Sequence, residues 1–489
     1  MASFTIISVL VVYLAVLLAI GAWGARESVN LAGYYVAGKR LPAWVIAFSA
    51  NATGESGWLL LGLTGMGYVV GVHALWVVLG EVLGVALAWA FVALPFKRYT
   101  DRYGSITVTD YLTSRFRDST HAIRFVSTVI IGSMVTAYAA AQLTASGKAF
   151  DAFLGTGYTG GVLIGAAVII FYTTVGGFKA VAYSDLLQGV LMFGGLCVLP
   201  IVGVFAVGGW LPMVESLRSA DPRLLEPMGT FGLSISGVVS AASFAGIGLA
   251  FLGAPQLLTR FMAARSEGEI VSGSLLAVMC IIVFDVGAVL TGMAGRVLMP
   301  GLTDPETVLP AMSVGLLPAL FTGLFLVIVL GAIMSTADSL LLLASSAVVR
   351  DVGQPVFRPD LDERRLARYG KATTVVLGLG APGFALTEVR LIFWFVLFAW
   401  SGLASAFTPV VLCSLFWDRT TRAGALAGMV TGFLSAVIWV IVFKSDFYGL
   451  YEIWPGFLAG FSATIVVSFL TAPPDGAVEE HQAIWSSQG

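Results

Sequence analysis

Long apolar runs constrain the fold of this sequence more than any other feature. A run of about 20 apolar residues can cross the hydrocarbon core of a bilayer as a helix, and a scan finds thirteen such segments along the 489 residues. Only 11% of the residues are charged and 58% are hydrophobic, whereas soluble domains have about 25% charged residues. We therefore predict an all-α integral membrane protein with thirteen transmembrane helices.

The positive charges between the segments predict an orientation, because cytoplasmic loops are enriched in Lys and Arg. The first run, Phe4 to Ala22, has no basic residue before it, so we interpret it as a retained helix and not as a signal peptide. With the N-terminus outside, 20 of the 26 positive residues fall in inside loops, and the outside loops keep Lys148, Arg218, Arg223, Arg296, Arg390 and Lys444. The expected location is the plasma membrane, in a bacterium the inner membrane, with a cytoplasmic C-terminus.

The composition argues against nucleic-acid binding and against enzyme activity. A formal net charge of -2 provides no basic field for nucleic acid. The three histidines are isolated and the three cysteines lack the spacing of a metal site, so no enzyme is expected. A membrane sensor remains an alternative, although the polar tail after Pro473 is short for a signalling domain. The expected partners are the bilayer and a small-molecule substrate, and no obligatory protein partner is evident.

The second segment, Leu41 to Val70, is interrupted at its middle by polar and glycine residues between Ser49 and Trp58. At mid-membrane depth such a stretch can unwind and expose carbonyls and helix ends that bind ions and substrate. Close packing of small residues is the alternative, but it does not account for a mid-span carboxylate, Glu55, next to an asparagine.

A matching interruption occurs in the seventh segment, where residues 243–255 contain three glycines and a proline. Corresponding interruptions in two halves of a transporter indicate an inverted repeat with the binding site at its interface. The sequence then divides into an extra N-terminal helix with the first inside loop (1–40), a first five-helix repeat (41–208), a second five-helix repeat (209–418), two C-terminal helices (419–472) and a cytoplasmic tail (473–489).

The ninth segment places small and hydroxyl side chains on one helix face. Ala332, Ser335, Thr336 and Ser339 follow the i, i+3, i+4, i+7 spacing, with Asp338 beside them. Hydroxyls that face the carbonyls of an unwound segment would form a cage of hard oxygen ligands suited to Na⁺. Alternatively, each hydroxyl bonds to a carbonyl of its own helix.

Carboxylates inside a membrane are costly and indicate function. Five fall within or at the mouth of the predicted segments: Glu55, Glu81, Asp185, Asp285 and Asp338. Asp185 could guide an ion at the inner mouth, cap a helix or pair with Lys179. For Glu81 and Asp285, a hydrogen-bonded structural carboxyl and a proton relay both remain open.

These segments resemble the sodium:solute symporter family, most closely its proline-permease branch. The resemblance extends through nearly the whole chain and is most specific in Ser56–Leu60, Gly176–Asp185, Arg260–Ala263, Met334–Thr336, Gly424–Met429 and Leu450–Ile453. It implies a leucine-transporter-like 5+5 inverted repeat with one helix added in front. The implied activity is alternating-access symport of Na⁺ with a small organic solute, best matched by proline or a related small amino acid.

The resemblance also implies residue roles. The main Na⁺ site would be formed by the backbone carbonyls of Ala52 and Glu55 together with Ala332, Ser335 and Thr336. A second ion or an exit station would lie at Asp185, Asp338 and Ser339. The substrate cavity would be lined by Thr53, Ser56, Tyr138, Gln142, Ile247 and Phe251.

The chain departs from the branch at two places. Proline permeases have an aspartate where this chain has Gly54 and a methionine where it has Glu55, so the charge moves by about 100° around a helix. Glu55 could then favour Na⁺ electrostatically, or take a proton and make the carrier an H⁺-coupled symporter of a small amino acid or monocarboxylate. Ile247 and Phe251 replace the tryptophan and tyrosine that proline permeases use against the substrate ring.

Overall fold

The computed structural model describes residues 2–26, 28–386, 392–474 and 476–486, so Arg390 and parts of the C-terminal tail lie outside the described residues. The described chain consists of helices joined by turns and loops. Within it no strand forms, and the one isolated bridge joins Leu41 to Ala264. The prediction of an all-α protein is therefore confirmed.

Twenty α-helices follow one another along the described chain. The first ten are α1 (Ala2–Ala25), α2 (Leu31–Val36), α3 (Ala43–Gly57), α4 (Thr64–Val70), α5 (Leu75–Leu87), α6 (Ala93–Arg102), α7 (Val108–Arg115), α8 (Ala122–Leu154), α9 (Tyr158–Val207) and α10 (Trp210–Ala220). The others are α11 (Ile235–Gly246), α12 (Pro255–Met262), α13 (Glu267–Leu298), α14 (Val308–Leu316), α15 (Ala319–Ser346), α16 (Glu363–Ala385), α17 (Ile392–Phe416), α18 (Arg422–Ile438), α19 (Ile453–Leu470) and α20 (Ala477–Ser486).

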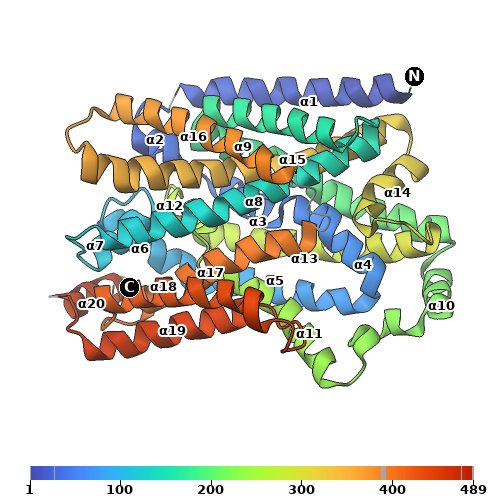
Figure 1. Ribbon diagram of the computed structural model, residues 1–489. Helices are drawn as coiled ribbons and strands as arrows, with labels where there is room; N and C mark the ends of the chain where they lie inside the picture. Colours follow the sequence, from blue (N-terminus) through green and yellow to red (C-terminus); the bar gives the residue numbers. More distant parts are fainter. Residues whose placement is uncertain (1, 27, 387–391, 475, 487–489) are drawn as a thin grey trace.

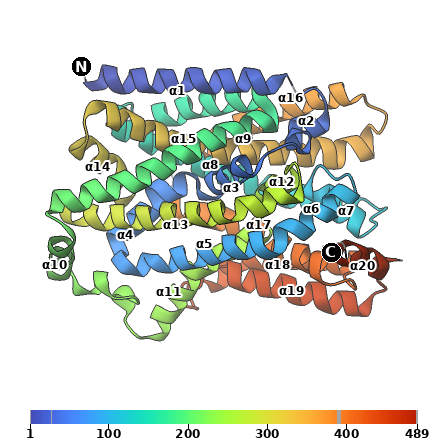
Figure 2. The same cartoon turned by 180° about the vertical axis from the view of Figure 1, so that it is seen from behind.

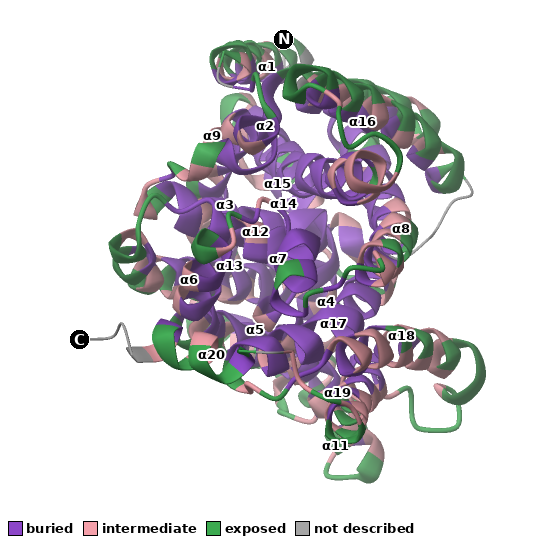
Figure 3. Ribbon diagram, turned by 90° about the vertical axis from the view of Figure 1, so that its left-hand side faces the viewer, coloured by how far each residue is buried: buried purple, intermediate pink, exposed green. Residues whose placement is uncertain are grey.

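The long helices form a bundle in which α1 lies along one edge and α18 and α19 lie along the opposite edge (Figures 1 and 2). Ten helical stretches of the described chain are long and apolar enough to cross a membrane. Buried residues gather in the middle of the bundle and exposed ones at its periphery (Figure 3). The exposed residues include large apolar side chains such as Phe4 on α1 and Leu470 on α19, as expected for helices that contact lipid.

Segments that were predicted to lie inside the cell gather at one end of the bundle. Helices α2, α7 and α20 lie at the left end in Figure 1, whereas α10 and α14 lie at the right end. Lys39 bonds to Asp101 with 2.9 Å between nitrogen and oxygen, and the Tyr99 hydroxyl lies 2.9 Å from Nδ1 of His481. These contacts join the segment after α2 to α6, and α6 to α20, which are distant in the sequence.

Both predicted interruptions are present. In α3 the helical backbone breaks at Ser56, whose φ of 56° and ψ of -172° lie outside the helical region, and π-helical turns follow over Trp58–Leu63. In the seventh segment α11 ends at Gly246, a 3-10 helix spans Ile247–Leu252, and Pro255 begins α12. Proline is well placed there, because the first turn of a helix needs no donor from its backbone nitrogen.

Glycines bring α5 against the backbone of the interrupted seventh segment. A Cβ atom at Gly80 would lie 2.2 Å from the carbonyl oxygen of Ala245, and one at Gly84 would lie 2.2 Å from that of Gly248. Any larger residue would therefore push the two elements apart. This close approach fixes the position of Glu81, which follows Gly80 on α5.

The tail was predicted to be a polar terminal segment, but its described part contains helix α20, which docks on the bundle. The indole nitrogen of Trp485 donates to the carbonyl of Leu415 at 3.2 Å, and Arg102 pairs with Glu480 at 3.3 Å. Helix α20 therefore covers the end of the bundle where α6 and α17 terminate.

Candidate ion and substrate site

Two hydroxyls of α15 contact the backbone of α3 just before its break. The Ser335 hydroxyl donates to the carbonyl of Ala52 at 2.8 Å, and it also lies 3.0 Å from the carbonyl of Ala332 on its own helix. The Thr336 hydroxyl donates to the carbonyl of Thr53 at 2.9 Å. The structure therefore brings together Ala52, Ala332, Ser335 and Thr336 from two segments that are nearly 300 positions apart.

This group has the chemistry of an alkali-cation site. Its oxygens come from carbonyls and hydroxyls, which are neutral and hard, and all four residues are buried. A Na⁺ ion held there would take its ligands from Ala52, Ala332, Ser335 and Thr336. The carbonyl of Glu55 lies farther along α3 and accepts from the backbone of Trp58, while the Glu55 side chain points to a separate acidic group described below.

Asp185 belongs to a second buried polar group, which is centred on Arg260. Its Oδ2 accepts from the Ser49 hydroxyl at 2.6 Å and lies 3.1 Å from the guanidinium of Arg260. The same guanidinium donates to Thr53 at 2.7 Å and contacts Ser339. Asp185 and Arg260 are 0% and 1% exposed, so this ion pair is shielded from solvent.

The partner of Asp185 corrects one of the sequence interpretations. Lys179 was one candidate, but its ammonium lies 4.1 Å from the ring centre of Trp23, and Arg260 pairs with Asp185 instead. Sequence reasoning missed Arg260, because 75 residues separate it from Asp185. The available signal was a single arginine close to the Gly and Pro residues of an apolar segment.

Asp338 and Ser339 adjoin the group around Arg260. The Ser339 hydroxyl lies 3.2 Å from Oδ1 of Asp338 and also bonds to the carbonyl of Ser335 at 2.8 Å. The alternative that hydroxyls bond within their own helix holds in part: Ser335 and Ser339 bond both within α15 and to other segments, whereas Thr336 reaches across to α3. A small cavity of about 20 Å³ lies beside Arg260 and Ser339.

The expected substrate residues separate into two sets. Tyr138 and Phe251 both pack edge-on against Trp400, with ring centres 6.2 and 5.5 Å apart, and the Trp400 indole donates to the carbonyl of Ile247 at 3.1 Å. Thr53 instead lies in the group around Arg260. Trp400 was not predicted, because the aromatic residues of α17 look like ordinary membrane-helix composition.

Gln142 and Ser56 lie at the break itself. The side-chain oxygen of Gln142 accepts from the backbone of Gly57 at 3.1 Å, and the Ser56 hydroxyl accepts from the backbone of Trp58 at 3.0 Å. These bonds satisfy backbone donors that the interrupted helix leaves free. The break is thus held by α8 on one side and lies next to the hydroxyls of α15.

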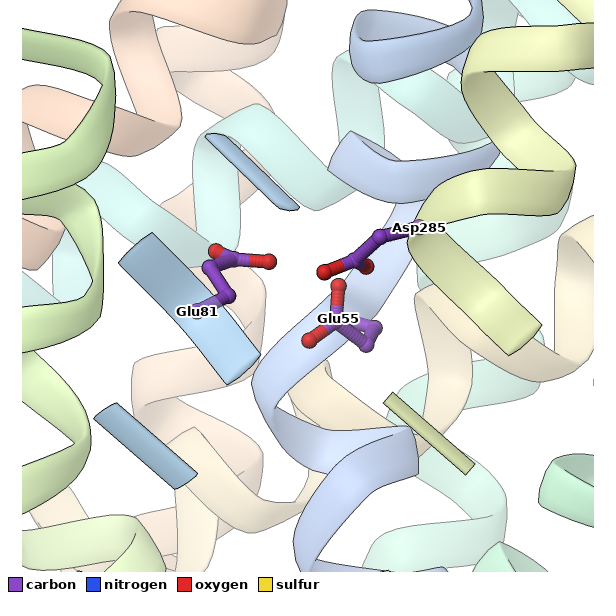
Figure 4. Close-up of side chains that lie close together, drawn as sticks. All are labelled: Glu55, Glu81 and Asp285. Atoms are coloured by element: carbon purple, nitrogen blue, oxygen red, sulfur yellow. The ribbon is translucent and has the colours of Figure 1, made fainter. Parts of the chain in front are cut away.

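A third buried group contains only carboxylates. Glu55 of α3, Glu81 of α5 and Asp285 of α13 point toward one another, and one oxygen from each lies within 4.8 Å of the others (Figure 4). Sequence reasoning found no partner for Glu81 or Asp285. Both lie next to Glu55 and next to each other. Because the three residues are on three separate helices, they form no sequence motif that would have predicted the cluster.

Comparison with known proteins agrees with this architecture. The sodium:solute symporter family model matches residues 34–432. The chain is 37% identical to the high-affinity proline transporter PutP of Bacillus subtilis, over 95% of this chain and 98% of that protein. It is 33% identical to the sodium/proline symporter of Staphylococcus aureus, over 96% of this chain and 93% of that protein.

Among solved structures, a Na⁺-coupled sialic acid symporter in a substrate-bound outward-open state has the same fold. The TM-score is 0.79 at 19% sequence identity, covering 96% of this chain and 98% of that one. The fold, the family match and the full-length relatives agree that this is a transporter and not an enzyme, with Na⁺ as its coupling ion. The chain belongs to the sodium:solute symporter family.

Proposed function

We propose that this symporter uses the Na⁺ gradient to take up proline or a related small amino acid. The observation that carries the proposal is the contact of Ser335 and Thr336 with the carbonyls of Ala52 and Thr53, immediately before the break at Ser56. An ion held by these residues would fix the backbone next to Gly54, where an added Cβ atom would lie 2.9 Å from the ring of Phe251. The names of the full-length relatives support proline as the solute.

The solute would bind near Trp400, where Tyr138 and Phe251 place aromatic surface and Ile247 exposes backbone next to its interruption. Such a pocket suits a small molecule with a compact apolar ring and a charged end, since aromatic faces bury apolar surface while helix ends bind charge. Ser56 and Gln142 would contribute polar contacts at the break. The group of Asp185, Asp338 and Ser339, with Thr53 beside it, would serve as a second ion site or an exit station.

We further propose thirteen spans with a 5+5 inverted repeat. Three features support this count beyond the ten apolar stretches. The stretch Ala43–Arg102 is 60 residues long and turns at Gly71, where φ is 57°. Helix α9 is divided at Gly177, where φ is 63°, and α16 adds 23 further helical residues.

The two broken segments support the repeat, because the break in α3 and the break before α12 lie five spans apart on this count. The repeats would cover residues 41–208 and 209–418, after an N-terminal unit (1–40) and before the C-terminal helices (419–472) and tail (473–489). The distribution of Lys and Arg supports an N-terminus outside and a C-terminus in the cytoplasm.

The mechanism that follows is alternating access. In the outward-facing state, Na⁺ binds between α3 and α15 and orders the break, which raises the affinity for the solute, and the solute reciprocally raises the affinity for Na⁺. The bundle then rocks and releases both on the inner side. No covalent chemistry is needed, because the Na⁺ gradient supplies the free energy.

Proton coupling is a second candidate, favoured by the buried position of the Glu55 carboxylate. Uptake of radiolabelled proline into proteoliposomes, with a Na⁺ gradient and a proton gradient imposed separately, distinguishes the two. We expect uptake with the Na⁺ gradient and none with the proton gradient alone. Proton-driven uptake that Glu55→Gln abolishes would contradict Na⁺ coupling, and no proline uptake under either gradient would contradict the substrate assignment.

A further inference from the structure

Three carboxylates from three helices converge at one point of the bundle interior. Glu55, Glu81 and Asp285 are 0%, 2% and 0% exposed, and Figure 4 shows their carboxyl groups turned toward a common centre. Their helices are held firmly there. Gly80 places α5 against the seventh segment, and the Asn51 amide donates to the carbonyl of Ala277 at 2.7 Å, which ties α3 to α13.

Five of the six carboxylate oxygens have no hydrogen-bond donor among the described residues. Both oxygens of Glu55, both of Asp285 and Oε2 of Glu81 are buried without a partner among the described residues. Nor does any described Lys, Arg or His form an ion pair with the three. A charged carboxylate that is buried in a membrane protein without a positive partner is strongly destabilising.

The geometry suits a shared cation. Oxygens that coordinate one Ca²⁺ ion lie about 2.3–2.6 Å from it, so two of them are at most about 5 Å apart. Na⁺ has a similar ionic radius, and the 4.8 Å limit on the oxygen separations falls inside this range. Mg²⁺ binds at about 2.0–2.1 Å and usually keeps several of its waters, so a dry group of carboxylates suits it less.

The group is separate from the contact between α3 and α15. Glu55 follows Thr53 by two residues, which is about 200° around a helix, so the two side chains leave α3 on nearly opposite faces. An ion among the carboxylates would nevertheless touch the same short part of α3 that carries the carbonyls of Ala52 and Thr53. Two cations could therefore order the break from its two sides.

We propose that Glu55, Glu81 and Asp285 form a binding site for a hard cation, Na⁺ or Ca²⁺, in addition to the site at Ser335 and Thr336. The site adds an ion to the proposed function without depending on the solute. Glu55 supplies the ligand on the broken helix, while Glu81 and Asp285 supply ligands from helices on either side.

Equilibrium binding of ²²Na⁺ and ⁴⁵Ca²⁺ to the purified, detergent-solubilised protein tests this directly, without any need for transport. If the ligand is Na⁺, wild type binds two ²²Na⁺ ions, and Glu55→Gln and Asp285→Asn each bind one. If it is Ca²⁺, wild type binds one ⁴⁵Ca²⁺ ion, which the same two variants lose. Ser335→Ala should keep the carboxylate-bound ion in either case.

A matched control is Glu452→Gln, which removes a buried carboxylate that pairs with Lys444 at 2.7 Å outside the acidic group. It should bind as many ions as wild type. Unchanged binding of both isotopes by Glu55→Gln and Asp285→Asn would overturn the proposal and indicate that the group holds only protons. Loss of ²²Na⁺ binding confined to Ser335→Ala, together with no ⁴⁵Ca²⁺ binding by wild type, would also overturn it, while leaving the proposed function intact.

Discussion

The two faces of α3 differ in whether a basic side chain lies next to the buried carboxylates. On one face Ser49 and Thr53 contact Asp185, whose charge is matched by the guanidinium of Arg260. On the other face Glu55 meets two further carboxylates and no base. On the first face the guanidinium of Arg260 offsets the charge of Asp185, although Oδ1 of Asp185 and Oδ2 of Asp338 have no partner among the described residues. The second face has no base among the described residues, so its charge needs a proton or a cation from outside.

The two faces therefore differ in how much of their negative charge the protein itself offsets. A carboxylate that is paired with an arginine can stabilise the fold without a bound ion. A group that is incomplete without an added positive charge responds to the ion concentration, which is what a coupled transporter requires. The break at Ser56 lies between the two, and so does the contact with Ser335 and Thr336.

The largest expected effect is the loss of stability when the ion pair between Arg260 and Asp185 is broken. Arg260→Met would leave Asp185 buried and unpaired, which costs about 3–5 kcal/mol. We expect a sharp fall in the yield of folded protein and in the apparent Tm in detergent. The double variant Arg260→Met with Asp185→Asn should recover part of the stability. An unchanged Tm in the single variant would contradict the role of the pair.

Substitutions at the contact between α3 and α15 should weaken Na⁺ binding more than they lower the stability of the protein. Ser335→Ala or Thr336→Ala removes one neutral oxygen ligand, and we expect the Na⁺ concentration for half-maximal proline uptake to rise about tenfold, equivalent to about 1.4 kcal/mol. Expression should be close to wild type, because Ser335→Ala removes only a hydroxyl and Thr336→Ala only a hydroxyl and one methyl group. Retention of full Na⁺ dependence in both variants would refute the site.

Changes at Trp400, which packs on Tyr138 and Phe251, should affect solute binding and leave Na⁺ dependence unchanged. Trp400→Ala removes the ring that packs on Tyr138 and Phe251, and aromatic pairs contribute about 0.5–1.5 kcal/mol each beyond the area they bury. We expect KM for proline to rise several-fold with little change in the Na⁺ dependence measured at saturating proline. Trp400→Phe should lie between wild type and alanine. A change in Na⁺ dependence with no change in KM would assign Trp400 to the ion site instead.

The smallest effect on stability is expected for Glu55→Gln, on the acidic face of α3. Whether the apparent Tm rises or falls shows whether Glu55 has a structural partner. Glu55→Gln removes a charge that has no partner, so in ion-free buffer we expect the apparent Tm to stay the same or to rise. Addition of the bound cation should raise the Tm of wild type, while this variant should gain less. A large loss of stability in ion-free buffer would mean that Glu55 has a structural partner.

Much of the fold follows from the sequence because bilayer insertion depends on local composition. Apolar length predicted that long helices cross the membrane, and the glycine and proline residues near Ser56 and Pro255 predicted where two of the segments break. The docked helix α20 was missed, because its polar composition resembles that of a free tail and its contacts with Tyr99 and Leu415 are tertiary.

The site was predictable only where residues lie on one helix or where family resemblance assigned them. The face of Ser335 and Thr336 follows from helical spacing. The pairing of Asp185 with Arg260, the position of Trp400 and the meeting of Glu81 with Asp285 are contacts between distant segments. A single sequence has no periodicity that encodes them, so they required the three-dimensional arrangement.

The central claim is that Na⁺ between α3 and α15 and the solute at the break stabilise each other. The most direct test is equilibrium binding of radiolabelled proline to purified protein across a range of Na⁺ concentrations, with ²²Na⁺ binding measured with and without proline. We predict that Na⁺ lowers the Kd for proline, that proline lowers the Kd for Na⁺ by the same factor, and that Ser335→Ala reduces both effects. Proline binding of equal affinity with and without Na⁺ would contradict the account.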